Sequence, residues 1–331
     1  SPCWCVVTTL RNQITTRTIP PTLRNSRAGR RRQAGKFFIH RLWRKIEVMA
    51  ILSIQSHVSY GHVGNSAAVF PLQRIGHEVW PVHTVNFSNH TGYGEWTGEL
   101  IPAAQVSSII DGIQARGAFP TIDAILSGYQ GGSDIADAIV DAVAKIKAEN
   151  PNALYACDPV MGNAKSGCFV SDLIPPLLRD KVVPVADIIT PNQFELSYLT
   201  GVDADDIDST LKAAEAARKI GPETILVTSV LRPDRPEHTI EMIAVNDQGA
   251  WKVQTPFLDI KRNGSGDVTA ALFTGHYVRD KDAAGALAKT AAAVYELIEL
   301  THAKDSRELL LIDAQESYVH PTHQFEVTKI A

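Results

Sequence analysis

The chain has 331 residues, enough for one large α/β domain or two smaller ones, and its 44% hydrophobic content is ordinary for a globular protein. No apolar run approaches the roughly eighteen residues needed to cross a membrane, which excludes a membrane-spanning helix. The four cysteines match neither a set of zinc-binding pairs nor a secreted disulfide framework. They favour a reducing compartment, and we expect a cytoplasmic protein.

The charge is distributed unevenly along the chain. Residues 1–46 contain eleven Lys or Arg and no Asp or Glu, although the whole chain has a net charge of −4. The remainder is therefore acidic and gives no electrostatic footprint for nucleic acid. We expect residues 1–48 to form a disordered basic extension and residues 49–331 to form the folded domain.

Three interpretations of the basic extension remain open. It is Arg-rich and acid-poor like an organellar transit segment, which would make the protein organellar. It could instead be a basic tail that binds an acidic partner. The third interpretation takes Met49 as the true start of the protein, because the first strand pattern begins directly after it.

From residue 50 onwards, short apolar runs alternate with helical patterns. Strands are predicted over residues 50–56, 79–87, 124–129, 154–157, 187–189 and 224–228, in a hairpin of residues 239–245 and 251–256, and weakly over 309–312. Helices are predicted over residues 66–75, 103–116, from a cap at Ser133 or Asp134 to 149, and over 171–179, 193–199, 206–220, from Asp267 onwards and 282–303. We expect the tail to residue 331 to be polar and poorly defined.

The alternation of strands and helices predicts an α/β fold with a mostly parallel central sheet and helices on both faces. Ligands of such sheets bind beyond the carboxyl ends of the strands. Polar side chains follow six of the predicted strands, so we expect them to converge at that edge. They are Ser56, Thr91, Tyr129, Asp158, Asn192, Glu195 and Thr228.

A Gly-rich turn, Gly264-Ser265-Gly266, leads into Asp267 and an Ala-rich helix. The N–H groups of such a turn and the helix dipole form a natural anion site. The turn is not a P-loop, because no Gly-Lys-Ser/Thr follows it. Asp267 is either the helix N-cap or a general base beside a bound phosphate, and the turn alone does not decide between them.

Two further acids have a structural and a functional interpretation. Asp158, followed by Pro159, either caps a turn or helps to hold Mg²⁺ near phosphates. Glu195 lies three residues after Asn192 in the first turn of a predicted helix. It either completes a capping box or binds magnesium through water.

Several short motifs together resemble the pyridoxal kinases of the ribokinase-like superfamily from about residue 49 to 299. The most specific are Gln55-Ser56-His57-Val58 and Ser88-Asn89-His90-Thr91, whereas Gly264-Ser265-Gly266-Asp267 marks only the superfamily. The others are Leu126-Ser127-Gly128-Tyr129, Cys157-Asp158-Pro159-Val160-Met161-Gly162 and Thr190-Pro191-Asn192-Gln193-Phe194-Glu195. The resemblance implies a three-layer α/β/α sandwich that transfers phosphate from ATP to the 5′-hydroxymethyl group of pyridoxal, and of related vitamers, in vitamin B6 salvage.

The resemblance also implies residue roles. Asp267 would be the base, and the N–H groups of Gly264, Ser265 and Gly266 would stabilise the transferring phosphoryl group. The vitamer would contact Ser56, Val63, Phe87, Thr91, Gly92 and Tyr129. The residues implied on the ATP side are Asp158, Thr190, Asn192, Glu195, Thr228, Ser229, Thr255, Pro256, Phe257 and Leu258. Asp158 and Glu195 would organise Mg²⁺, with K⁺ as a further candidate ion, and the protein would be a homodimer.

Three positions depart from the family pattern. Ser265 replaces the commoner Thr or Val of the Gly-rich turn, a change that keeps the backbone geometry and should be tolerated. Asn163 replaces an acid found in some members, and Thr228 replaces a Lys found in some bacterial members, so the contacts there are in doubt. Two alternatives to pyridoxal kinase remain: a kinase for hydroxymethylpyrimidine or another small alcohol, and a non-catalytic protein that binds pyridoxal or its phosphate.

Overall fold

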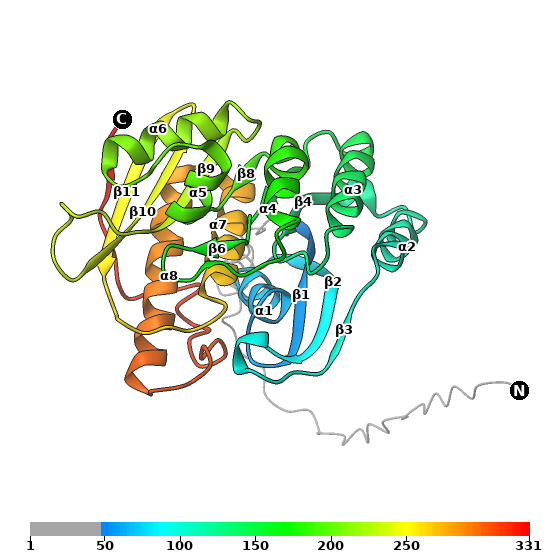
Figure 1. Cartoon of the computed structure of the whole chain (residues 1–331), viewed down its shortest axis with the longest axis horizontal. Coiled ribbons are helices and arrows are strands. Elements are labelled where there is room, and N and C mark those ends of the chain that lie inside the picture. The colour runs from blue at the N-terminus through cyan, green and yellow to red at the C-terminus, as the bar shows by residue number, and fades with distance from the viewer. Residues whose placement is uncertain (1–47) are drawn as a thin grey trace, which may run out of the picture. The chain divides into compact units, whose positions relative to one another are not determined.

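A ten-stranded mixed sheet forms the centre of the domain in a computed structural model that describes residues 48–331. Its strands lie in the order β12-β11-β10-β9-β8-β5-β4-β1-β2-β3 (Figure 1). The six strands from β9 to β2 are parallel, and the strands added outside them pair antiparallel. The prediction for residues 1–48 falls, except for Val48, outside the described residues.

The strands of this sheet vary from two to twelve residues in length. Their bounds are β1 Ala50–Tyr60, β2 Glu78–Asn89, β3 Gly98–Leu100, β4 Ile122–Ser127, β5 Leu154–Cys157, β8 Ile188–Ile189, β9 Thr224–Val230, β10 Thr239–Asn246, β11 Gly249–Pro256 and β12 Val327–Lys329. A small second sheet pairs β6 (Gly162–Asn163) with β7 (Gly167–Cys168).

Helices cover both faces of the sheet. One face carries α1 (Asn65–Arg74), α7 (Ser265–Asp280) and α8 (Ala283–Ala303). The other carries α2 (Ala103–Gln114), α3 (Ile135–Glu149), α4 (Ile174–Leu177), α5 (Gln193–Thr200) and α6 (Ile207–Arg218). This is the predicted three-layer α/β/α sandwich. No helix in residues 48–331 is long and apolar enough to cross a membrane.

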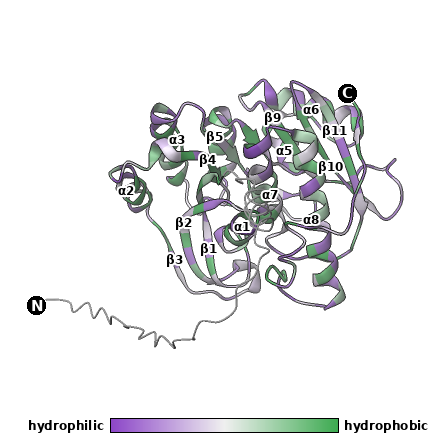
Figure 2. Cartoon of the chain, turned by 180° about the vertical axis from the view of Figure 1, so that it is seen from behind, coloured by the Kyte–Doolittle hydropathy of each residue, from purple (hydrophilic) through white to green (hydrophobic). Residues whose placement is uncertain are grey.

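Alternation along the strands explains the two helical layers. Side chains of successive strand residues point to opposite faces, so the adjacent buried residues Ile51 and Leu52 belong to different core clusters. Because both faces are covered, the inner strands are apolar throughout and not alternating. Figure 2 shows this as mostly hydrophobic strands in the middle of the domain and hydrophilic connecting loops.

Most predicted elements are confirmed within a few residues, and β5 matches its predicted bounds. The predicted helix over residues 171–179 is wrong in detail. It begins only at Ile174, and after one turn it widens into a π-helix, Leu178–Val182. Pro175 and Pro176 lack the N–H donors of a regular helix and can sit only in its first turn.

The prediction for the C-terminal tail is also wrong. Residues 309–312 form no strand, and the strand forms later as β12, which pairs antiparallel with β11. The tail is held by Glu296 of α8, whose Oε1 accepts hydrogen bonds from the backbone N–H groups of Thr322 (2.5 Å) and His323 (2.6 Å). These contacts join residues that are far apart in sequence, so no local sequence pattern predicts them.

Glu296 should make the stability of the domain depend on pH. Burial acts to raise its pKa, but hydrogen-bond donors that include His323 and Thr322 outweigh burial and lower it to about 2. Its contribution is therefore present above the ordinary Glu pKa and is lost as the pH falls towards 2. We expect Glu296→Gln to lower the free energy of unfolding by about 1–3 kcal/mol at pH 7.

Urea unfolding of Glu296→Gln and of the wild type at pH 7 and at pH 4 measures this effect. The difference between the two proteins should be smaller at pH 4. Glu299→Gln on the same helix is the control, because within residues 48–331 the hydrogen bond that Glu299 accepts is a local one, from Tyr295 four residues away. An equal loss for both variants at both pH values would contradict the assignment.

Candidate active site

The Gly-rich turn begins α7 with a left-handed residue. Gly264 is the N-cap with φ 90°, a conformation that residues other than glycine rarely adopt. A Cβ atom on Gly264 would lie 1.9 Å from the carbonyl oxygen of His62. The turn therefore requires glycine both for its backbone conformation and for the close approach of the loop between β1 and α1.

Asp267 is the third residue of α7, so its interpretation as the N-cap is wrong. The first N–H groups of a helix have no partner within the helix, which leaves those of Ser265 and Gly266 available to an anion. Burial raises the pKa of Asp267 to about 6, while the backbone N–H groups of Gly64 and of Asp267 itself act in the opposite direction. Asp267 can thus both hold and release a proton near neutral pH.

Asp158 brings a second carboxylate to the same place. It lies at the end of β5, is only 7% exposed and accepts a hydrogen bond from Thr190 Oγ1 at 3.0 Å. Burial raises its pKa well above the ordinary value, and repulsion from Glu195 and from Asp267 raises it further. Asp158 therefore lies close to both Glu195 and Asp267, at the edge of the sheet where polar side chains were expected to meet.

Glu195 is held by backbone donors. Its carboxylate accepts hydrogen bonds from the N–H groups of Met161 (3.0 Å), Gly162 (3.4 Å) and Asn192 (3.0 Å). Burial nevertheless raises its pKa to about 7. Asn192 Oδ1 accepts from Glu195 N at 3.0 Å, which completes the capping box of α5. The structural interpretation of Glu195 is confirmed, and Glu195 also fixes the loop that follows Asp158.

The remaining residues predicted on the ATP side follow along the same edge. Asn192 bridges to Thr228, which lies inside β9 and not after it as predicted. Ser229 has a left-handed backbone (φ 53°) that is unusual for a residue other than glycine. Residues 255–258, at the end of β11, lie two strands beyond β9.

The departure at Asn163 has a structural explanation. Asn163 Oδ1 accepts hydrogen bonds from the N–H groups of Lys165 and Ser166, both at 3.0 Å. The side chain therefore shapes the turn between β6 and β7, a task that an amide oxygen performs without adding negative charge beside Glu195.

An apolar cluster lies at the β1 and β2 end of the edge. Val63, Phe87 and Tyr129, all predicted to contact the vitamer, pack together with Val58 and Val85. Ser56 is beside them but lies within β1, which continues to Tyr60, and not after the strand as predicted. A Cβ atom on Gly64 would lie 2.3 Å from Ser56 Oγ, so Ser56 is next to the loop that contacts Asp267.

The segment after β2, which we call the flap (residues 88–97), reaches the Gly-rich turn. Thr91 and Gly92 are exposed in a short 3₁₀ helix, Thr91–Tyr93. His90 Nδ1 is 3.0 Å from Gly92 N and 3.2 Å from Asn263 Nδ2, immediately before the turn. The contact between His90 and Asn263 was not predicted from the sequence, although His90 lies within one of the specific motifs.

Comparisons with known proteins agree with this geometry. Residues 121–308 match the family described as phosphomethylpyrimidine kinase. The chain is 77% identical over 283 residues to a pyridoxal kinase PdxY of Corynebacterium diphtheriae, which covers 86% of this chain and all of that protein. It is 65% identical over 282 residues to a pyridoxal kinase PdxY of Leifsonia xyli subsp. xyli, with 85% and 100% coverage.

The chain belongs to the pyridoxal kinase family. Solved structures agree: a pyridoxal kinase from Leishmania donovani in complex with ADP and pyridoxamine superposes with a TM-score of 0.80 at 29% identity. The superposition covers 85% of this chain and 99% of the Leishmania donovani chain. The ribokinase-like fold that the sequence motifs implied is therefore confirmed.

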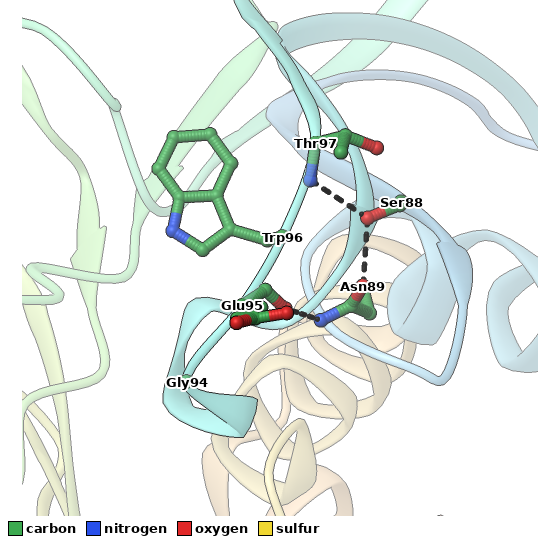
Figure 3. Close-up of a pocket in the computed structure, with 6 residues that line it drawn as sticks. All are labelled: Ser88, Asn89, Gly94, Glu95, Trp96 and Thr97. Carbon is green, nitrogen blue, oxygen red and sulfur yellow. Dashed lines mark hydrogen bonds between the residues drawn. The ribbon is translucent and has the colours of Figure 1, made fainter.

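A pocket of about 440 Å³ lies in the flap of this pyridoxal kinase family member (Figure 3), and none of Asp158, Glu195 and Asp267 lines it. Its polar groups bond to one another: Thr97 N donates to Ser88 Oγ, and Asn89 Nδ2 donates to the carbonyl of Glu95. These bonds hold the two strands of the flap together. Its Trp96 packs on Phe87 with ring centroids 4.2 Å apart, which links the flap to the apolar cluster.

The kinase site also fits a divalent cation. No group of three or more His, Cys, Asp or Glu side chains in residues 48–331 forms a ready-made metal cage. Mg²⁺ does not need one, because it uses one or two carboxylates together with waters and phosphate oxygens. A bound cation would relieve the repulsion that Glu195 and Asp267 exert on Asp158.

Replacing Gly264 with Ala tests the constraint on the turn. The new Cβ would collide with the carbonyl of His62 in a left-handed backbone, so we expect a lower melting temperature, corresponding to more than about 1 kcal/mol. Gly266→Ala is the matched control, because nothing lies within 4 Å of a Cβ there. Thermal unfolding that ranks the two variants equally would contradict the constraint.

Proposed function

We propose that Asp267 is the general base of an ATP-dependent pyridoxal kinase that phosphorylates the 5′-hydroxymethyl group of pyridoxal. The observation that carries this proposal is the position of Asp267 on the first turn of α7, beside free N–H groups and opposite Asp158. The hydroxyl oxygen attacks the γ-phosphorus of ATP and gives its proton to Asp267. The bond to the bridging oxygen breaks and ADP leaves.

The vitamer ring would lie against the apolar cluster. Val63, Phe87 and Tyr129 provide a dry surface for a flat ring, and Ser56 provides a hydroxyl group next to Gly64. Thr91 and Gly92 would cover the ring from the flap. This arrangement also suits pyridoxine and pyridoxamine, which the Leishmania donovani structures contain together with ADP.

The phosphates would occupy the space between the Gly-rich turn and the ends of β5, β8 and β9. The N–H groups of Gly264, Ser265 and Gly266 would stabilise the charge that develops on the transferring phosphoryl group. Thr190, Asn192, Thr228 and Ser229 would bind the remaining phosphate oxygens. Residues 255–258 would lie along the adenine and ribose.

Kinases that use ATP require a divalent cation, and we assign Mg²⁺ to Asp158 directly and to Glu195 through water. The cation would neutralise charge on the phosphates. A need for K⁺ and a homodimeric assembly are proposed on the family resemblance alone. Sedimentation velocity and assays with and without K⁺ test these two proposals.

A kinase for hydroxymethylpyrimidine is the second candidate, because the matched family description names phosphomethylpyrimidine kinase. The two substrates share a hydroxymethyl group on a flat nitrogen ring, so the same base could serve either. A comparison of kcat/KM for pyridoxal, pyridoxine, pyridoxamine and hydroxymethylpyrimidine on one preparation separates them. A preference for hydroxymethylpyrimidine would overturn the pyridoxal assignment.

Asp267→Asn tests the base and also the idea of a non-catalytic binder. The amide keeps the shape but cannot accept the proton, so we expect kcat to fall by about three orders of magnitude with little change in the Kd for pyridoxal. Steady-state assays and calorimetric titration measure the two quantities. A binder would show the same negligible turnover in the wild type, and an active Asp267→Asn would remove the base assignment.

The pH profile provides an independent test of Asp267. With a pKa of about 6, the carboxylate becomes protonated as the pH falls through 6 and can no longer accept the hydroxyl proton. We expect kcat/KM to fall about tenfold per pH unit below that value and to level off above it. A profile that stays flat down to pH 5 would contradict this role.

A further inference from the structure

A short segment after α8, residues 305–309, contacts three separate loops of the site. We call it the strap. It is anchored at one end by the bond from Ser306 N to the carbonyl of Thr301 and at the other by Leu309, which is fully buried. In Figure 1 the strap belongs to the orange-red chain that follows α8 and passes beside the cyan flap.

Glu308 of the strap holds the loop between β1 and α1. Its Oε2 accepts a hydrogen bond from His62 N at 3.0 Å. A Cβ atom on Gly61 would lie 2.6 Å from the same oxygen, so the carboxylate packs directly on the loop backbone. The carbonyl of His62 then meets Gly264, and the N–H of Gly64 faces Asp267. Glu308 is thus two contacts away from both the Gly-rich turn and the base.

The strap also holds the segment that enters the Gly-rich turn. Arg262 Nε donates to the carbonyl of Ser306, and its guanidinium lies 3.6 Å from Asp305 Oδ1. Leu309 approaches Gly264 from the protein interior. The turn is therefore held on one side by the β1–α1 loop and on the other by the strap itself.

The third contact is with the flap. The guanidinium of Arg307 lies over the ring of Tyr93, 3.7 Å from its centroid. Such a cation–π contact is worth about 0.5–1 kcal/mol at an exposed site, enough to bias a short flap without locking it. Tyr93 ends the 3₁₀ helix that carries Thr91 and Gly92.

We propose that Glu308 is a positioning residue that aligns the Gly-rich turn and Asp267 through the β1–α1 loop, and that Arg307 positions the flap over the vitamer. The proposal rests on the proposed kinase function for its kinetic consequence. Glu308 touches no reacting atom. It acts on kcat through alignment, because small displacements of catalytic groups are costly in rate.

Glu308→Ala should lower kcat about 10- to 100-fold with a smaller change in KM for either substrate. Glu308→Gln keeps an oxygen that can accept the His62 N–H bond and should recover most of the rate. Glu316→Ala is the matched control, because Glu316 lies further along the same C-terminal segment and pairs with Arg74 at the far end of α1. It should leave kcat unchanged.

Hydrogen exchange of the backbone amides in residues 61–64 and 264–267 gives a readout that needs no activity. Exchange should be faster in Glu308→Ala than in the wild type and unchanged in Glu316→Ala. Arg307→Ala should raise KM for pyridoxal several-fold and leave kcat and KM for ATP near the wild-type values. This split separates the flap contact from the loop contact.

The outcomes separate the two proposals. An inactive wild type would remove the proposed function, while the exchange comparison would still decide whether Glu308 orders the loop. An active wild type with normal kcat in Glu308→Ala would overturn the positioning role. The same would follow from a loss of rate in Glu308→Gln as large as in Glu308→Ala.

Discussion

The contact between Gly264 and the carbonyl of His62 is the constraint on which the site depends. A left-handed residue at the N-cap lets the chain turn into α7 while the β1–α1 loop lies against it. That approach brings the N–H of Gly64 to Asp267 and places Ser56 close by. Any side chain at Gly264 would push the two loops apart and move Asp267 away from Ser56 and the apolar cluster.

The second constraint is electrostatic. Asp158, Glu195 and Asp267 lie close enough for burial and mutual repulsion to raise the pKa of Asp158 well above its ordinary value. Three backbone N–H groups offset part of this cost at Glu195, which stays fixed as an anchor for the loop after Asp158. The buried negative charge at Asp158 would therefore be stabilised by a bound cation.

The alternation of apolar runs and helical patterns was enough to predict the sheet, both helical layers and the edge where the polar residues meet. It worked because each strand and helix buries a face with its own period, which is a local property of the sequence. The position of Asp267 within α7 was not predictable, since it depends on a glycine conformation and on a loop two hundred residues away. The other wrong predictions have different causes: two adjacent prolines shorten the helix predicted over residues 171–179, and pairing between distant segments forms β12 in place of the strand predicted over residues 309–312.

Roles that depend on long-range contacts had no signal in the sequence. Glu308 is an ordinary acid after a helix until the fold brings it to His62. Asn263 likewise becomes meaningful only through its contact with His90, which joins the flap to the Gly-rich turn. The motif residues, by contrast, could be found because their chemistry requires particular residue types close together in the sequence.

A crystal structure of the chain with ADP, Mg²⁺ and pyridoxal tests the central claim most directly. The account predicts the 5′-hydroxyl oxygen within hydrogen-bond distance of an Asp267 carboxylate oxygen, with the ring on Val63, Phe87 and Tyr129. A ring bound in the flap pocket of Ser88 and Thr97, or a hydroxyl group turned away from Asp267, would contradict it.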